Sequence, residues 1–172
     1  ETLVMRVLEG KEESLIKDVF NEFCRLYSGE SKAEAKSTVL ALWQTINEKQ
    51  LISDDLKSNT LRWLMFSDGL SDSKDLILAS IEHIKNEQHF RRLFEYLNKY
   101  VNESPEDCLE VLHKALDSHL PHVLKILEEI LEKIYKMKGV DGDARVEDIT
   151  NIFIAKGDDR VHDLLNKLRG EE

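Results

Sequence analysis

Three histidines in the middle of the chain have the spacing that a metal site would require. His119 and His122 are three residues apart, so both rings could face one ion, and His113 precedes them on a neighbouring predicted helix. The glutamate of a His-Glu-x-x-His zinc motif is missing, and the pair falls at a predicted helix start, where ring directions are not fixed. We therefore interpret all three as partly exposed structural histidines and predict no metal site. A metal-dependent enzyme that uses these rings is our third hypothesis for function.

A basic and aromatic patch is predicted around Arg91 and Arg92, with Tyr96 about one helical turn away. Arginines beside an aromatic ring are typical of surfaces that contact nucleic acid or a phosphorylated partner. The competing interpretation is that the arginines pair with Glu87 and Glu95 on the same helix. Because the net charge of −10 argues against nucleic acid, we keep Arg91, Arg92 and Tyr96 as candidate protein-interaction residues.

Two aspartates near the end of the chain resemble the beginning of a calcium-binding loop. Asp141 and Asp143 are two residues apart, but the fifth and twelfth positions of such a loop hold Arg145 and Ile152. Calcium requires oxygen ligands at both of those positions. We therefore predict a turn over residues 139–144 and no ion site.

Two further sets of reactive side chains are predicted to be structural. Asp68, Asp72 and Asp75 lie between predicted helices, where aspartates commonly cap helix ends and face solvent. Cys24 and Cys108 lie on apolar helix faces, so we expect buried and inert thiols. The sequence contains no glycine-rich phosphate loop, no G-x-S-x-G turn and no paired-cysteine motif. We therefore predict neither catalysis nor a cofactor.

The composition is that of an acidic helical protein. The 172 residues are 41% hydrophobic and 34% charged and include only 7 Gly and 2 Pro, which favours helices over sheets. No apolar run approaches the roughly 18 residues of a membrane span, so we predict no membrane partner. Two distant cysteines make no disulfide framework, which is typical of a cytoplasmic protein. The chain begins at Glu1 without a signal-peptide pattern, which is compatible with a fragment of a longer chain.

The stretch from Ser104 to Lys138 predicts two consecutive helices around which the others pack. Ser104 is a good N-cap and Pro105 fits the first helical position, so a helix is predicted over residues 105–118. The next helix, over residues 121–137, carries two adjoining apolar stripes, whereas a surface helix carries one. We therefore place this second helix at the centre of the core.

About ten helices with short connections are predicted along the chain. Apart from the central pair, they cover residues 1–9, 14–27, 32–49, 53–66, 74–85, 86–103, 146–156 and 158–168, with a loop over residues 67–73. Helical hairpins recur over residues 15–49, 53–85, 88–118 and 121–156, at roughly the length of helix-pair repeats. We predict one all-α domain over residues 1–172, an irregular HEAT-like α-solenoid of antiparallel hairpins. A compact helical bundle is the alternative.

Two segments in the last third of the chain resemble a known class of helical repeats. They are the helix LPHVLKILEEILEKIY and the closing pair VEDITNIFIAKGDDRVHDLLNKLRGEE. Residues 109–168 resemble the C-terminal HEAT-like repeats of large prokaryotic multidomain proteins, such as signalling or defence NTPases. In such proteins the repeats act as sensors or scaffolds while other domains carry out the chemistry. The resemblance implies that the GDD break and the last helix close the stack.

The first hypothesis for function is a non-catalytic helical scaffold that binds another protein or another domain of a longer chain. It depends on the absence of a catalytic motif and on the predicted hairpins, which typically offer a concave surface. The alternative is a small oligomeric regulator that associates through an apolar stripe such as Leu3–Val7 or Leu164–Leu168. The sequence leaves the oligomeric state open.

Overall fold

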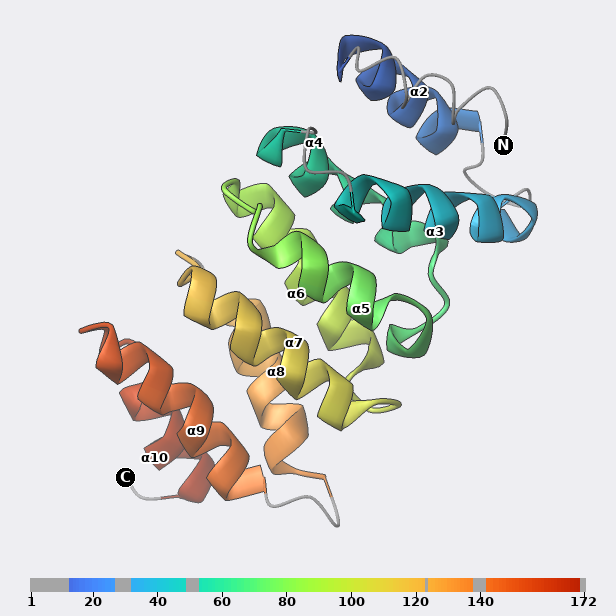
Figure 1. Ribbon diagram of the computed structural model, residues 1–172. Helices are drawn as coiled ribbons and strands as arrows, with labels where there is room; N and C mark the ends of the chain where they lie inside the picture. Colours follow the sequence, from blue (N-terminus) through green and yellow to red (C-terminus); the bar gives the residue numbers. More distant parts are fainter. Residues whose placement is uncertain (1–12, 27–31, 49–52, 123, 138–141, 171–172) are drawn as a thin grey trace. The chain divides into compact units, whose positions relative to one another are not determined.

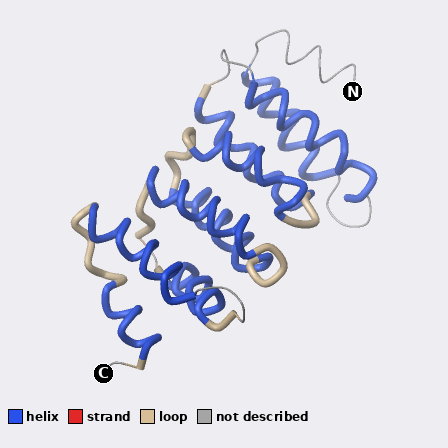
Figure 2. Tube along the Cα trace, turned by 60° about the horizontal axis from the view of Figure 1, so that its bottom comes forward, coloured by secondary structure: helices blue, strands red, loops and turns tan. Residues whose placement is uncertain are grey.

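The computed structural model describes residues 13–26, 32–48, 53–122, 124–137 and 142–170. Over these residues the chain forms nine α-helices and one 3₁₀ helix, and no described residue lies in a strand (Figure 2). The predicted all-α class is confirmed. The helix expected over residues 1–9 lies outside the described residues. Both the HEAT-like solenoid and the compact bundle fit these helices, so the choice between them stays a prediction.

The chain divides into two compact units, Glu1–His89 and Phe90–Glu172. The boundary falls in the first turn of helix α6 (Glu87–Tyr100), which Figure 1 shows in green. In the part of the chain that the structure describes, no helix is long and apolar enough to cross a membrane.

The first unit contains α2 (Glu13–Leu26), α3 (Lys32–Glu48), α4 (Asp54–Asn59), the 3₁₀ helix η1 (Thr60–Phe66) and α5 (Leu70–Ile81). Helix α3 packs against both η1 and α5. Trp43 of α3 is fully buried, and its indole Nε1 donates a hydrogen bond to Ser80 Oγ of α5 at 2.8 Å. The same hydroxyl lies 3.2 Å from Asn47 Oδ1 of α3. Because buried polar groups need partners, this network fixes α3 against α5.

Helix α5 begins four residues earlier than predicted, at Leu70, so the expected loop over residues 67–73 is wrong in its second half. Leu70 is buried, and Ser73 Oγ donates a hydrogen bond to Gly69 O at 3.1 Å. Serine and aspartate are typical of loops, but they also suit the first turn of a helix. Burial of Leu70 decides between these two possibilities.

The second unit contains the rest of α6 with α7 (Pro105–Ser118), α8 (Lys125–Tyr135), α9 (Gly142–Ala155) and α10 (His162–Arg169). The predicted start of α7 is confirmed, with Ser104 at the N-cap and Pro105 in the first turn, although the Ser104 side chain makes no capping hydrogen bond. Helix α9 packs against α7, α8 and α10. The two apolar stripes predicted for this helix are buried in part. Leu127, Ile130, Leu131 and Ile134 are fully buried, whereas Leu124, Ile126 and Met137 are half-buried.

Helix α8 begins at Lys125 and not at Pro121, so its predicted start is wrong. The carbonyl oxygens of Pro121 and His122 accept hydrogen bonds from the guanidinium of Arg160, at 3.1 and 3.0 Å. A helix would direct those carbonyls to amides one turn later. The distant arginine therefore holds this segment as a loop.

Helix α9 begins at Gly142, inside the segment that was predicted to be a turn. A Cβ atom at this position would lie 2.6 Å from Tyr135 Cα and 2.8 Å from Ile134 O, at the end of α8. Glycine therefore allows the two helices to approach closely. At its other end α9 stops at Ala155, and Gly157, two residues later, has a φ of 74°. Asp158 N–H bonds to Phe153 O and Gly157 N–H bonds to Ile154 O, both at 2.9 Å, as in a Schellman motif.

Candidate functional site

Two helices of the second unit form the sides of an open groove. Helix α7 contributes one side and α9 the other, and the groove has a volume of about 460 Å³. Its lining includes Leu109 and Ile149, which are only 6% and 1% exposed. The remaining lining residues are charged or titratable side chains: Glu106, Asp107, Glu110, His113, Lys114, Asp117, Arg145 and Asp148.

The amphipathic pattern of α7 explains why these side chains gather on one face. The groove positions recur at intervals of three and four residues between Glu106 and Asp117. The apolar core positions of the same helix point in other directions: Cys108, Val111, Leu112, Ala115 and Leu116. Because apolar residues recur at helical spacing along one face of α7, the polar residues between them gather on the face that lines the groove.

Polar contacts cross the groove at two levels. At one end, Arg145 of α9 donates a hydrogen bond to Glu106 of α7 at 2.7 Å. Further along, His113 lies between two carboxylates, with Nε2 3.3 Å from Asp148 Oδ2 and Nδ1 3.5 Å from Asp117 Oδ2. A neutral imidazole has one N–H and can donate to one carboxylate only, whereas a protonated ring can donate to both.

The charge of the groove is negative. Five carboxylates line it, against the two permanent cations Lys114 and Arg145. Carboxylates attract ammonium and guanidinium groups and repel phosphates. The groove is therefore suited to cationic ligands and unsuited to nucleic acid.

The three histidines that could have formed a metal site do not converge. The ring of His119 stacks on Phe90, with ring centres 4.7 Å apart and an interplanar angle of 23°. His122 meets His119 edge-on at 6.2 Å, whereas His113 lies in the groove beside Asp117 and Asp148. Among the described residues, no group of three or more His, Cys, Asp or Glu side chains is placed to hold a metal ion.

The candidate patch at Arg91, Arg92 and Tyr96 does not form a common surface. Tyr96 is only 8% exposed, and its ring packs against Tyr100 at 4.8 Å between centres. Arg91 Nε donates a hydrogen bond to Glu95 at 3.0 Å, as the competing interpretation predicted. Arg92 is exposed on the same helix. The aromatic part of the patch is therefore not accessible beside the arginines.

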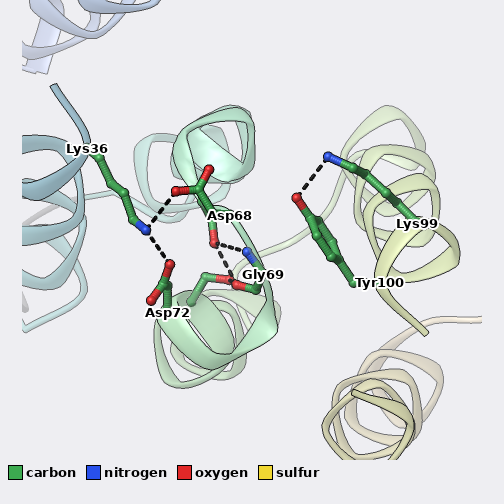
Figure 3. A network of polar contacts seen from close by, with 8 residues as sticks. Lys36, Asp68, Gly69, Asp72, Lys99 and Tyr100 are labelled. Carbon is green, nitrogen blue, oxygen red and sulfur yellow. Dashed lines mark hydrogen bonds and ion pairs between the residues drawn. The ribbon is translucent and has the colours of Figure 1, made fainter. Parts of the chain in front are cut away.

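Asp68, between η1 and α5, and Asp72, in the first turn of α5, bind a lysine of the same chain. Lys36 Nζ lies 2.5 Å from Asp72 Oδ2 and 2.9 Å from Asp68 Oδ2 (Figure 3). The hydrogen bonds that the Lys36 ammonium donates, mainly to Asp72 and then to Asp68, raise the pKa of Lys36. These two carboxylates therefore hold α3 against the start of α5.

The remaining candidate side chains are the two cysteines and the aspartates of the predicted turn. Cys108 is buried as predicted, and burial raises the pKa of its thiol to about 12 despite the opposing charge of Lys133. Such a thiol stays protonated at neutral pH and is a poor nucleophile. The side chains of Cys24 and Asp143, and all of Asp141, lie outside the described residues.

The apolar stripe considered for self-association is partly buried. Leu164 is only 7% exposed, because α10 packs against α8 and α9. The other stripe, Leu3–Val7, lies outside the described residues. Leu164 therefore belongs to the core of the second unit.

The groove was not predicted from the sequence. Its acidic side on α7 was detectable in principle, because Glu106, Glu110, His113 and Asp117 repeat at intervals of three and four residues. Its other side comes from α9, nearly forty positions later, and no local pattern connects the two. Comparisons with protein-family models, with curated proteins and with solved structures gave no match to this chain.

Proposed function

We propose that this chain is a non-catalytic helical scaffold that binds another protein, or another domain of a longer chain, through the groove between α7 and α9. The observation that carries the proposal is the groove itself, which combines an apolar base with charged sides on two packed helices. Sites that recognise ligands are typically concave and combine apolar surface with a few placed polar groups. The resemblance of residues 109–168 to HEAT-like scaffold repeats supports the same role.

A site-specific cross-linking experiment tests this proposal. A photoreactive amino acid replaces Lys114, which lines the groove, in the chain expressed in its native cells. The matched control carries it at Lys125, which is exposed on α8 and does not line the groove. We expect a cross-linked product from position 114 that position 125 does not give, identified by mass spectrometry. Equal products from both positions, or none from position 114, would contradict the proposed function.

A further inference from the structure

We propose that the groove between α7 and α9 binds a short cationic segment of a partner protein, with arginine or lysine side chains on either side of an apolar one. This inference rests on the proposed function and specifies the chemistry of the partner.

The contact within the chain is the ion pair between Arg145 and Glu106. The guanidinium reaches from α9 to a carboxylate on α7 and lies 2.7 Å from it. The groove thus already holds one arginine side chain between its two sides. Asp107 and Glu110 lie on the same side of the groove as Glu106. Both already interact within the chain, but a carboxylate has about four acceptor sites, so each can also accept from a guanidinium that comes from outside.

The base of the groove accounts for the apolar part of the segment. Leu109 and Ile149 reach the lining although they are almost fully buried, so a small apolar surface lies below the carboxylates. An apolar side chain of the partner that lies on this base loses contact with water. The cationic side chains on either side of it then reach the carboxylates at the rim of the groove.

The length of the groove limits the segment. The lining residues of α7 run from Glu106 to Asp117, which corresponds to about 16 Å of helix. An extended peptide covers that distance with about five residues. A second copy of this chain is a poorer occupant, since each copy carries a net charge of −10.

Peptide binding to the full chain tests the inference. The probe is a fluorescein-labelled peptide of sequence RLRLR, measured by fluorescence anisotropy, with ELELE and RGRGR as comparison peptides. We expect saturable binding of RLRLR that weakens as salt is added, weaker binding of RGRGR and no binding of ELELE.

The groove variant is the double substitution Asp107→Asn with Glu110→Gln. Its matched control is Glu103→Gln with Asp159→Asn, which also removes two negative charges, but from exposed positions outside the groove. We expect the groove variant to bind RLRLR about fivefold more weakly, because it loses two partly exposed ion pairs. The control should bind like the unaltered chain, and circular dichroism should show the same helix content in all three.

Several outcomes would overturn the inference. They are no binding of RLRLR, equal binding of ELELE, equal weakening by both double variants, and displacement of the peptide by calcium or by self-association of the chain. These outcomes are distinct from failure of the proposed function. That function fails if position 114 gives no specific cross-link, whereas a specific cross-link without peptide binding leaves a scaffold whose partner is not cationic.

Discussion

The hydrogen bond between Trp43 and Ser80 joins two helices at a buried position. The indole is fully buried, and its N–H has the Ser80 hydroxyl as its acceptor at 2.8 Å. Leaving a buried donor without an acceptor costs more than a typical hydrogen bond contributes, because the group has lost its water as well. Ser80 is therefore a sensitive position of the first unit.

We predict that Ser80→Ala lowers the free energy of unfolding by about 1–3 kcal/mol, measured by urea denaturation. The control is Ser71→Ala, at an exposed position of the same helix, which should change stability by less than about 0.5 kcal/mol. A Ser80→Ala protein as stable as the Ser71→Ala protein would show that the indole finds another acceptor.

Burial of Cys108 predicts a loss of stability in alkali. Its thiol has a pKa of about 12 in the folded chain, against an ordinary value of 9.0. Between these two values the unfolded chain releases the proton and the folded chain keeps it, so rising pH favours unfolding. We expect the free energy of unfolding to fall above pH 9 by up to about 1.4 kcal/mol per pH unit from this group.

The measurement compares urea unfolding at pH 8, 9 and 10, with Cys24 replaced by serine so that only one thiol titrates. The control adds Cys108→Ala, which should remove this part of the slope and leave the part that comes from lysines and tyrosines. Parallel slopes in the two proteins would mean that the Cys108 thiol ionises as easily in the folded chain as in the unfolded one.

Close approach of α8 and α9 requires glycine at position 142. An added Cβ would meet backbone atoms of Tyr135 and Ile134 at 2.6–2.8 Å, and backbone moves less easily than a side chain. We predict that Gly142→Ala destabilises the chain by about 1–3 kcal/mol in urea denaturation, as overpacking does. In the control Gly69→Ala, the new methyl group meets only Ser71 Oγ, at 3.9 Å, and should cost little. Similar losses in both would show that the loss does not come from close packing at position 142.

Arg160 determines the conformation of the loop before α8. It bonds to the carbonyls of Pro121 and His122 and also to Asp158, whose pKa it lowers through its side chain. A lowered carboxyl pKa stabilises the fold above the ordinary value of 3.8, and this stabilisation is lost as the pH falls through the folded value.

We therefore predict that Arg160→Ala destabilises the chain at pH 7 and that its difference from the unaltered chain shrinks below pH 4. Arg160→Lys should recover little, because one ammonium group cannot make the fork of bonds that a guanidinium makes. Thermal unfolding at pH 7, 5 and 3 measures this difference. A constant difference across the three pH values would exclude Asp158 from the effect.

The helices could be predicted from apolar spacing, but the starts of α5, α8, α9 and α10 could not. The last of these helices begins at His162 and not at the predicted residue 158. The stripe through Leu127, Leu131 and Ile134 was sufficient to place α8, because helical spacing of apolar residues indicates which of them are buried. Its first residue depends on Arg160, which lies far away in sequence, and the start of α9 depends on how closely Gly142 approaches α8. Such contacts leave no local pattern.

The candidate site could not be predicted from the sequence for the same reason. The predicted candidates were chosen because their spacing suits chemistry, and the structure separates them: His113 from His119, and Tyr96 from Arg91. The groove instead joins charges of α7 and α9 that are ordinary surface residues in each helix alone. Only tertiary packing makes one side face the other.

For the whole chain, the division into two compact units predicts how it unfolds. Each unit has its own buried apolar residues, such as Leu61 in the first and Leu112 in the second. Units with separate cores generally can unfold separately. A substitution in one unit should therefore affect mainly the unfolding of that unit.

The positions of the indole rings make this division visible to spectroscopy. The chain has two tryptophans, Trp43 and Trp63, and both belong to the unit Glu1–His89. Tryptophan emission therefore follows the melting of one unit, while far-ultraviolet circular dichroism records the helices of both. Gly142→Ala should lower the midpoint seen by circular dichroism and leave the emission midpoint unchanged, with no dye or label attached. If both midpoints move together, the two units melt as one.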